Sequence, residues 1–215
     1  MSARRTAAKR RRPASARTRR RRARRGRAPK RSRGPLVIAL LGAGAVAFGV
    51  SRIDFGEAIR EITLPLEHED IIREQAERFE LDPALIAAII NQESGFADQT
   101  SSAGARGLMQ ITHDTADTIE RLSGGETFTY DDLADPELNI RYGTYYFDYL
   151  MNMYAGNVVA ALSAYNAGPG NADAWGGAAM EAGDIHFVET RAYVDDVLEN
   201  REQYEANYAK ELGID

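Results

Sequence analysis

Apolar and small residues recur with a helical period over much of residues 67–212. The first such stripe comprises Ile71, Ile72, Ala76 and Phe79, with Gln75 on the same face. Its spacing of about 3.6 residues predicts a helix that ends near Leu81. No segment shows the two-residue alternation of a half-buried strand, so the pattern favours the α fold class.

A second helix is predicted immediately after the first. Asp82-Pro83 is typical of an N-cap followed by the first helical position, where proline is tolerated. Residues 84–90 are all apolar, which indicates a helix that is buried on every side. Glu93 comes at the C-terminal end of this helix.

Four further helices are expected, separated by turn signals. Residues 99–107 are rich in serine and glycine and are typical of a loop. Helices are predicted to start near Thr112 and at Asp135-Pro136, the second running to about Tyr154. The next covers 157–166 and is closed by Gly168-Pro169-Gly170, and the last covers 189–208.

Charge divides the chain sharply. Residues 1–33 hold 17 of the 27 Lys and Arg residues and no acidic residue, so residues 34–215 carry 10 basic against 32 acidic side chains, a formal charge of −22. Segment 1–34 lacks the large apolar residues that offset the entropy of ordering, which predicts a disordered tail. Such a tail can bind nucleic acid or anionic lipid. We expect it instead to set membrane topology, with no specific nucleic-acid partner.

The apolar segment that follows, 35–51, is a membrane-targeting segment without charged side chains. It is at the short end of what crosses a hydrocarbon core of about 30 Å. One interpretation is an uncleaved anchor that keeps the arginines in the cytoplasm. The other is a signal peptide cleaved after Ala45-Val46-Ala47, which would give a secreted protein. We favour the inner-membrane anchor because the basic region is longer than an export signal needs. Either way, a linker at 52–66 leads to a domain at 67–212 in the periplasm or extracytoplasmic space.

Cysteine is absent from the sequence, which excludes disulfides and thiolate chemistry. The histidines, His68, His113 and His186, are far apart and lack the paired spacing of zinc sites. We therefore expect no metal and no cofactor.

Four short motifs follow one another in an order that suits a single carbohydrate-cleaving cleft. They are Glu93-Ser94, Gly107-Leu108-Met109-Gln110, Ala164-Tyr165-Asn166-Ala167-Gly168 and Glu189-Thr190. A carboxyl group at the C-terminal end of a buried helix faces the negative end of the helix dipole and loses hydration, and both effects raise its pKa. Glu93 is therefore a candidate general acid for breaking a glycosidic bond. The competing interpretation is a solvated glutamate at a helix end.

The later motifs offer groups suited to an aminosugar. Gly104 and Gly107 allow the backbone to approach a ligand closely, and Gln110 can both donate to and accept from an acetamido group. Tyr165 offers an apolar face for a sugar ring and a hydroxyl for developing charge, although a core tyrosine would look the same. Glu189, with Tyr193 one turn on, is expected to line the cleft or simply to favour a helix start.

Together these motifs resemble those of the lytic transglycosylases of bacterial cell walls, which have the goose-type lysozyme fold. The resemblance implies a lysozyme-like, mostly helical single domain with Glu93 as the catalytic residue. The substrate contacts that it implies are Ser94, Ser101 (or Ser102), Met109, Gln110, Tyr165, Asn166 and Glu189. His113 departs from the family, which usually has proline there, and we interpret it as a changed helix start.

The resemblance also implies the reaction and the partner, the glycan strands of peptidoglycan. The family has one catalytic carboxylate, and the 2-acetamido group of the substrate assists departure of the leaving sugar. Glu93 would first be the acid and then the base for the 6-hydroxyl of N-acetylmuramic acid. The MurNAc-β-1,4-GlcNAc bond would be cut without water to give 1,6-anhydro ends. The alternatives are a lysozyme-like hydrolase, with Asp98 or Asp114 as second carboxylate, and a non-catalytic glycan-binding scaffold.

Overall fold

The computed structural model describes residues 63–124 and 128–214. The expected tail (1–34), the expected membrane-targeting segment (35–51) and most of the expected linker lie outside the described residues. Every helix within the described ranges is too short or too polar to cross a membrane.

Helices make up most of the described chain. They are α3 (Glu69–Phe79), α4 (Pro83–Ser94), α5 (His113–Leu122), α6 (Pro136–Met153), α7 (Val158–Ala167), α8 (Pro169–Ala174) and α9 (Val188–Leu212). Three 3-10 turns complete them: η1 (Tyr130–Ala134), η2 (Gly177–Ala179) and η3 (Ala182–Asp184). In the described ranges, extended pairing is limited to two isolated bridges made by Arg106, with Thr100 and with Ile111. The predicted α fold class is confirmed.

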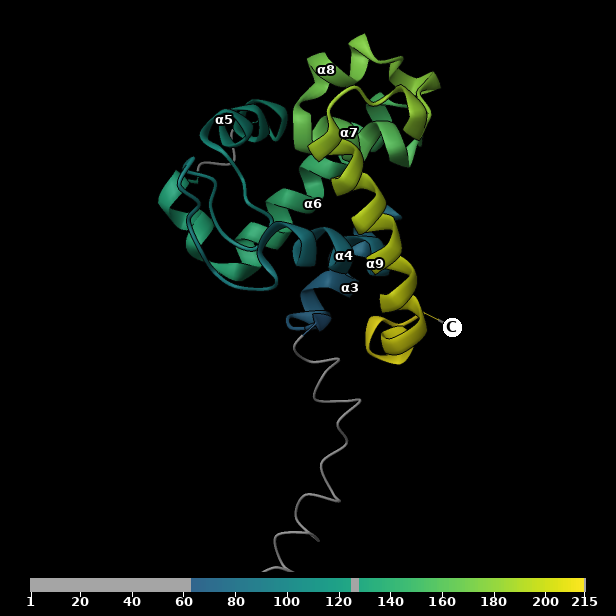
Figure 1. Ribbon diagram of the computed structural model, residues 1–215. Helices are drawn as coiled ribbons and strands as arrows, with labels where there is room; N and C mark the ends of the chain where they lie inside the picture. Colours follow the sequence, from purple (N-terminus) through teal and green to yellow (C-terminus); the bar gives the residue numbers. More distant parts are fainter. Residues whose placement is uncertain (1–62, 125–127, 215) are drawn as a thin grey trace, which may run out of the picture. The chain divides into compact units, whose positions relative to one another are not determined.

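Helix α4 is the centre of the fold. Its start is fixed by the Asp82 carboxylate, which accepts a hydrogen bond from the Ala84 N–H at 2.8 Å. Residues 84–90 are all buried, as expected for a helix with neighbours on every side. Helix α9 lies along α4 over much of its length, and α3 packs beside both (Figure 1). The Ser94 end of α4 is therefore held in a rigid setting.

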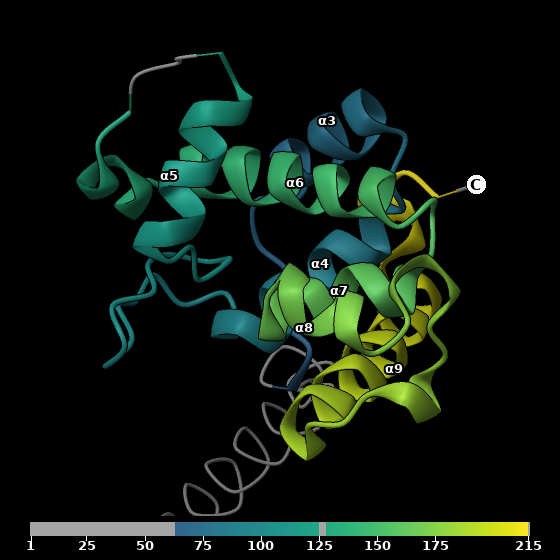
Figure 2. The ribbon, with the colours of Figure 1, turned by 90° about the horizontal axis from the view of Figure 1, so that it is seen from above.

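Helix α6 connects the central helices to the outer ones. It packs on α3 and α7, and it also contacts η1 and α5 (Figure 2). In Figure 1, α5 lies toward one end of α6, and α7 and α8 lie toward the other end on the same side. This arrangement leaves α5 and α7 as two separate walls above α6.

Two helix boundaries differ from the expectation. Gly168-Pro169-Gly170 was expected only to end a helix, but Pro169 is the first residue of α8, a position where proline is tolerated because that N–H needs no partner. The last helix continues past the expected end to Leu212, whose side chain is buried. The backbone is non-helical at Tyr208 (φ −133°, ψ 23°), so the expected end coincides with a kink.

The segment before α3 is attached to α9. The Tyr204 hydroxyl donates to the Pro65 carbonyl at 2.5 Å, and the Tyr208 hydroxyl donates to the Leu64 carbonyl at 2.9 Å. Leu64 is itself buried. Residues 64 and 65, expected in the linker, are thus packed into the helical domain.

Candidate active site

Glu93 lies in the last turn of α4, against α9. Its Oε1 accepts a hydrogen bond from the hydroxyl of Tyr193 on α9 at 2.7 Å. Burial raises the pKa of Glu93 from 4.5 to about 7, and the hydrogen bond from Tyr193 opposes part of that rise. The carboxyl group is therefore mostly protonated below neutral pH and about half protonated near pH 7.

Two adjoining cavities form a cleft above α6, between α5 and α7. The smaller, of about 220 Å³, is lined by Glu93, Ala105, Gln110, Ile111, Thr112, Thr115, Tyr146, Tyr165 and Asn166. The larger, of about 560 Å³, adds residues of α5, α6 and the α7–α8 turn, including Asp114, Tyr149, Met153 and Pro169. Five lining residues are common to both cavities: Thr112, Thr115, Tyr146, Tyr165 and Asn166. The cleft thus runs from Glu93 past Tyr165 toward the α7–α8 turn.

Carboxylates are scarce in this cleft. Among the described residues that line the smaller cavity, Glu93 alone carries one. Asp114 lines only the larger cavity, and Asp98 is exposed and lines neither. No group of three or more histidine, aspartate or glutamate side chains within the described ranges could hold a metal ion.

The loop between α4 and α5, which forms one wall of the cleft, is fastened by the buried side chain of Asn139 on α6. Its Nδ2 donates to the carbonyls of Arg106 and Leu133, each at 2.9 Å. Its Oδ1 accepts from the Met109 N–H at 2.7 Å. These hydrogen bonds use both N–H groups and the carbonyl oxygen of the Asn139 amide, so the loop has a defined position relative to α6.

Gly107 makes this attachment possible. Its φ is +74°, and a Cβ there would lie 2.1 Å from the Asn139 Nδ2 and 2.6 Å from the Leu133 carbonyl oxygen. Glycine is the residue that fits both the conformation and the space. The glycine that opens the second motif is thereby explained by close packing with Asn139.

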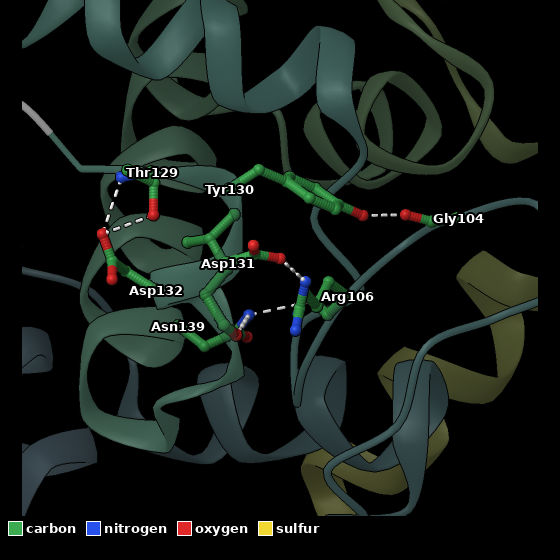
Figure 3. A network of polar contacts seen from close by, with 8 residues as sticks. Gly104, Arg106, Thr129, Tyr130, Asp131, Asp132 and Asn139 are labelled. Carbon is green, nitrogen blue, oxygen red and sulfur yellow. Dashed lines mark hydrogen bonds and ion pairs between the residues drawn. The ribbon is translucent and has the colours of Figure 1, made fainter.

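Contacts with η1 hold the outer part of the same loop (Figure 3). The Arg106 guanidinium pairs with Asp131 at 2.5 Å, and the Tyr130 hydroxyl donates to the Gly104 carbonyl. The Tyr130 ring also stacks on His113, with centroids 3.6 Å apart. His113 is the first residue of α5, whose N-cap is Thr112.

Tyr165 and Asn166 end α7 beside Glu93. The Tyr165 hydroxyl donates to the Met109 carbonyl at 2.8 Å, which joins α7 to the loop. Burial, and then the charge of the nearby Glu93, raise the pKa of Tyr165 well above 10. The Asn166 Oδ1 accepts from the Thr190 hydroxyl of α9 at 2.8 Å. This pair joins the third motif to the fourth.

The structure brings Glu93, Gln110, Tyr165 and Asn166 together in one cavity. Gln110 lies there with a φ of +47°, and its Nε2 donates to the Gly107 carbonyl at 2.8 Å. The Met109 side chain is fully buried, against Gly143. It lines neither cavity and packs where the glycine leaves room for its thioether, so its expected contact with substrate stays a prediction.

The other expected contacts lie outside the two cavities. The Ser94 hydroxyl donates to the Ile90 carbonyl at 3.2 Å, within α4. The Ser101 hydroxyl accepts from the Ala105 N–H at 2.9 Å, and Ser102 is exposed. Glu189 is exposed in the first turn of α9 and lines neither cavity.

Several lining residues had no motif to reveal them. Thr112, Thr115, Tyr146 and Tyr149 line the cleft but are ordinary residues of helices in the sequence. Tyr193 was placed only one turn beyond Glu189, and its bond to Glu93 joins residues 100 positions apart. The sequence signal that could have revealed Tyr193 is its position in the buried stripe of α9, four residues after Glu189 and followed by Val194 and Val197.

Comparisons with known proteins agree on one family. A family model described as the transglycosylase SLT domain matches residues 70–188. The soluble lytic murein transglycosylase of Escherichia coli (strain K12) is 35% identical over 162 residues, which are 71% of this chain and 24% of that protein. The membrane-bound lytic murein transglycosylase C of Edwardsiella ictaluri is 38% identical over 112 residues, 47% of this chain and 31% of that protein.

Solved structures give the same result. An inactive mutant of the lytic transglycosylase Slt from Pseudomonas aeruginosa is similar with a TM-score of 0.63 and 34% identity, covering 68% of this chain and 25% of that one. The 70-kDa soluble lytic transglycosylase of Escherichia coli has a TM-score of 0.63 and 32% identity, covering 70% of this chain and 26% of that one. The chain thus spans about a quarter of the length of the soluble relatives that it matches.

Proposed function

The chain belongs to the family of transglycosylase SLT domains, and on that basis we propose that residues 67–212 form a peptidoglycan lytic transglycosylase, a lyase acting on glycan strands. The domain cleaves the MurNAc-β-1,4-GlcNAc bond without consuming water and leaves 1,6-anhydro ends. The observation that carries this proposal is the lone carboxyl group of Glu93 in the smaller cavity, in contact with buried Tyr193.

Glu93 acts first as the general acid. Its pKa of about 7 keeps a large fraction of the carboxyl groups protonated near neutral pH, ready to donate to the glycosidic oxygen. As the bond to C1 breaks, the proton passes to the leaving sugar and Glu93 becomes a carboxylate. The Tyr193 hydroxyl then stabilises that charge through its hydrogen bond.

The second half of the reaction uses groups of the substrate. A hydrolase needs a second carboxylate about 5 to 9.5 Å from the acid, as nucleophile or as base for water. The residues lining the smaller cavity supply none. The 2-acetamido oxygen of the sugar bonds to C1 in its place. The 6-hydroxyl oxygen then attacks C1, the bond between C1 and the acetamido oxygen breaks, and the ionised Glu93 takes the proton of the 6-hydroxyl. The glutamic acid is regenerated and no atom of water enters.

Tyr165 and the amide side chains orient the sugar. The Tyr165 proton is committed to the Met109 carbonyl, so the phenolic oxygen presents lone pairs to positive charge that develops at C1. Gln110 and Asn166 line the same cavity and bind polar groups of the sugars. Four further residues line neither cavity: Ser94, Ser101, Met109 and Glu189. They support the groups that line the cleft, or they contact the sugars after moving when the substrate binds.

Residues 1–66 are proposed to place the domain at its substrate. Segment 35–51 anchors the chain in the inner membrane behind the basic tail, and the domain acts in the periplasm or extracytoplasmic space. The matched relatives include both soluble and membrane-bound lytic murein transglycosylases. Sizing the mature protein in membrane and soluble fractions tests the anchor against the cleaved signal.

Digestion of purified peptidoglycan followed by mass spectrometry tests the activity. We expect 1,6-anhydromuramoyl ends from the wild-type protein, none from Glu93→Gln, and full yield from Asp114→Asn, because Asp114 lies outside the Glu93 cavity. Reducing muramic ends that disappear with Asp114→Asn or Asp98→Asn would contradict the proposal and identify a hydrolase. Full biological function of Glu93→Gln would identify a scaffold.

A further inference from the structure

We infer that Phe187 is a sugar-stacking residue that extends the cleft along the glycan strand, an inference that rests on the proposed function. Phe187 immediately precedes α9. Three residues later, Thr190 donates to Asn166, which lines both cavities. One helical turn therefore separates Phe187 from the cleft wall. A glycan strand continues past any cavity, so its next sugar passes over residues at the mouth.

The Phe187 ring is exposed and yet held in place. Its exposed fraction is 42%, whereas that of its neighbour Trp175 is 7%. The two rings meet in a T-shape, with centroids 4.9 Å apart at 85°. In such a pair the second ring touches either the edge or one face of the first, so Trp175 does not cover both faces of Phe187. A ring oriented by a buried neighbour loses less rotamer freedom on binding.

The local sequence at Phe187 departs from what stability favours. Phe187 is the N-cap of α9, a position where Ser, Thr, Asp or Asn would accept a backbone N–H, and no side-chain cap bond is present there. Helices α4, α5, α6 and α7 are capped in that way by Asp82, Thr112, Asp135 and Asn157, whereas α3 and α8, like α9, have no side-chain cap bond. The chain therefore forgoes a cap at α9 and exposes an aromatic ring. Departures of this kind are expected at functional sites.

The chemistry of this position suits a neutral sugar. An aromatic face contacts the apolar face of a sugar ring without needing charge. Residues 34–215 carry a formal charge of −22, and Glu189 and Asp195 lie exposed on the same helix. An uncharged stacking contact holds the strand without opposing that charge.

Trp175 is the single tryptophan of the sequence, so its fluorescence reports on the surroundings of Phe187. We would titrate full-length Glu93→Gln protein, which does not consume its ligand, with peptidoglycan oligosaccharides of increasing length. Short oligosaccharides should bind without changing Trp175 emission, and longer ones should change it. Adding Phe187→Ser should abolish that change and raise Kd for the longer ones about tenfold, the effect of losing one stacking contact. Adding Val188→Ser, at a residue that is 76% exposed, should preserve both.

The choice of serine at position 187 distinguishes an effect on folding from an effect on binding. A serine at 187 supplies the missing capping hydroxyl, so Tm should equal or exceed that of the parent. A lower Tm with equal loss of affinity for short and long oligosaccharides would overturn the inference, because the ring would then only cover Trp175. An unchanged Kd for long oligosaccharides would overturn it as well, while 1,6-anhydro ends from the wild-type protein would leave the proposed function standing. Absence of binding by every oligosaccharide would overturn both.

Discussion

At the scale of single residues, the Glu93 carboxyl group links activity to folding. Its pKa is about 7 in the fold, against 4.5 for a solvated glutamate of an unfolded chain. A raised pKa means that the protonated acid is the form that the fold favours. The fold therefore loses stability as the pH rises from about 4.5 to about 7, and the full cost is present above that range.

Glu93→Gln should for this reason stabilise the protein at alkaline pH. The amide does not titrate, so the free energy of unfolding of the variant should exceed that of the wild type by at most about 3 kcal/mol at pH 8, and by little at pH 4. Urea unfolding across this range measures the difference. Glu189→Gln, a change at an exposed position, is the control and should show no such trend. A pH-independent difference for Glu93→Gln would rule out this coupling.

Tyr193→Phe should move the pH dependence of catalysis. The acid must be protonated to act, so kcat/KM should fall as the pH rises through about 7. The Tyr193 hydrogen bond favours the ionised form, and its removal should shift this fall to higher pH. Tyr204→Phe removes a buried hydroxyl that bonds to Pro65 instead, and its profile should match the wild type. An unshifted profile for Tyr193→Phe would argue against the assigned contact.

At the scale of elements, the loop between α4 and α5 is shaped by its contact with α6. Gly107 and Gly104 both have positive φ, but only at Gly107 would a Cβ meet other atoms within 4 Å. Gly104→Ala should therefore cost about 1 kcal/mol of stability from backbone strain alone. Gly107→Ala should cost about 3 kcal/mol or more, because Asn139 and the Leu133 carbonyl must also shift. Equal costs in urea unfolding would mean that the Asn139 contact is loose.

The helices could be predicted from sequence where their signals are local. Asp82-Pro83 gave the start of α4 because the cap and the proline act within three residues. The same kind of signal misled at Gly168-Pro169-Gly170, where a terminator of α7 is also the start of α8. Glycine and proline mark a break in the chain, but they do not say whether a new helix follows at once.

At the scale of the whole molecule, the sequence predicted several residues that line the candidate site, but not the hydrogen bonds that hold the site together. The motifs identified Glu93, Gln110, Tyr165 and Asn166, which line one cavity. The clamp made by Asn139 was missed because an asparagine inside a helix shows no sign of its partners on a distant loop. The bond from Tyr193 likewise depends on the packing of α9 against α4.

The negative charge of residues 34–215 should affect the proposed action on intact cell wall. Residues 34–215 carry a formal charge of −22, which repels anionic wall polymers at low ionic strength. We expect the initial rate to rise with added salt up to about 0.1 M, where the Debye length falls to about 10 Å. Turbidity of purified wall suspensions measures this rate, and neutral glycan fragments are the control, with a flat profile expected. A flat or falling profile on intact wall would contradict the prediction.

The packing of α9 along α4 has a consequence for the order in which the protein is made. Glu93 leaves the ribosome, and passes through any export channel, about a hundred residues before Tyr193, and its neighbours on α9 follow only then. A nascent chain with Val188–Leu212 still inside the channel has neither the hydroxyl that supports the carboxylate nor the helix that covers α4. The proposed activity therefore requires that α9 has emerged and packed against α4.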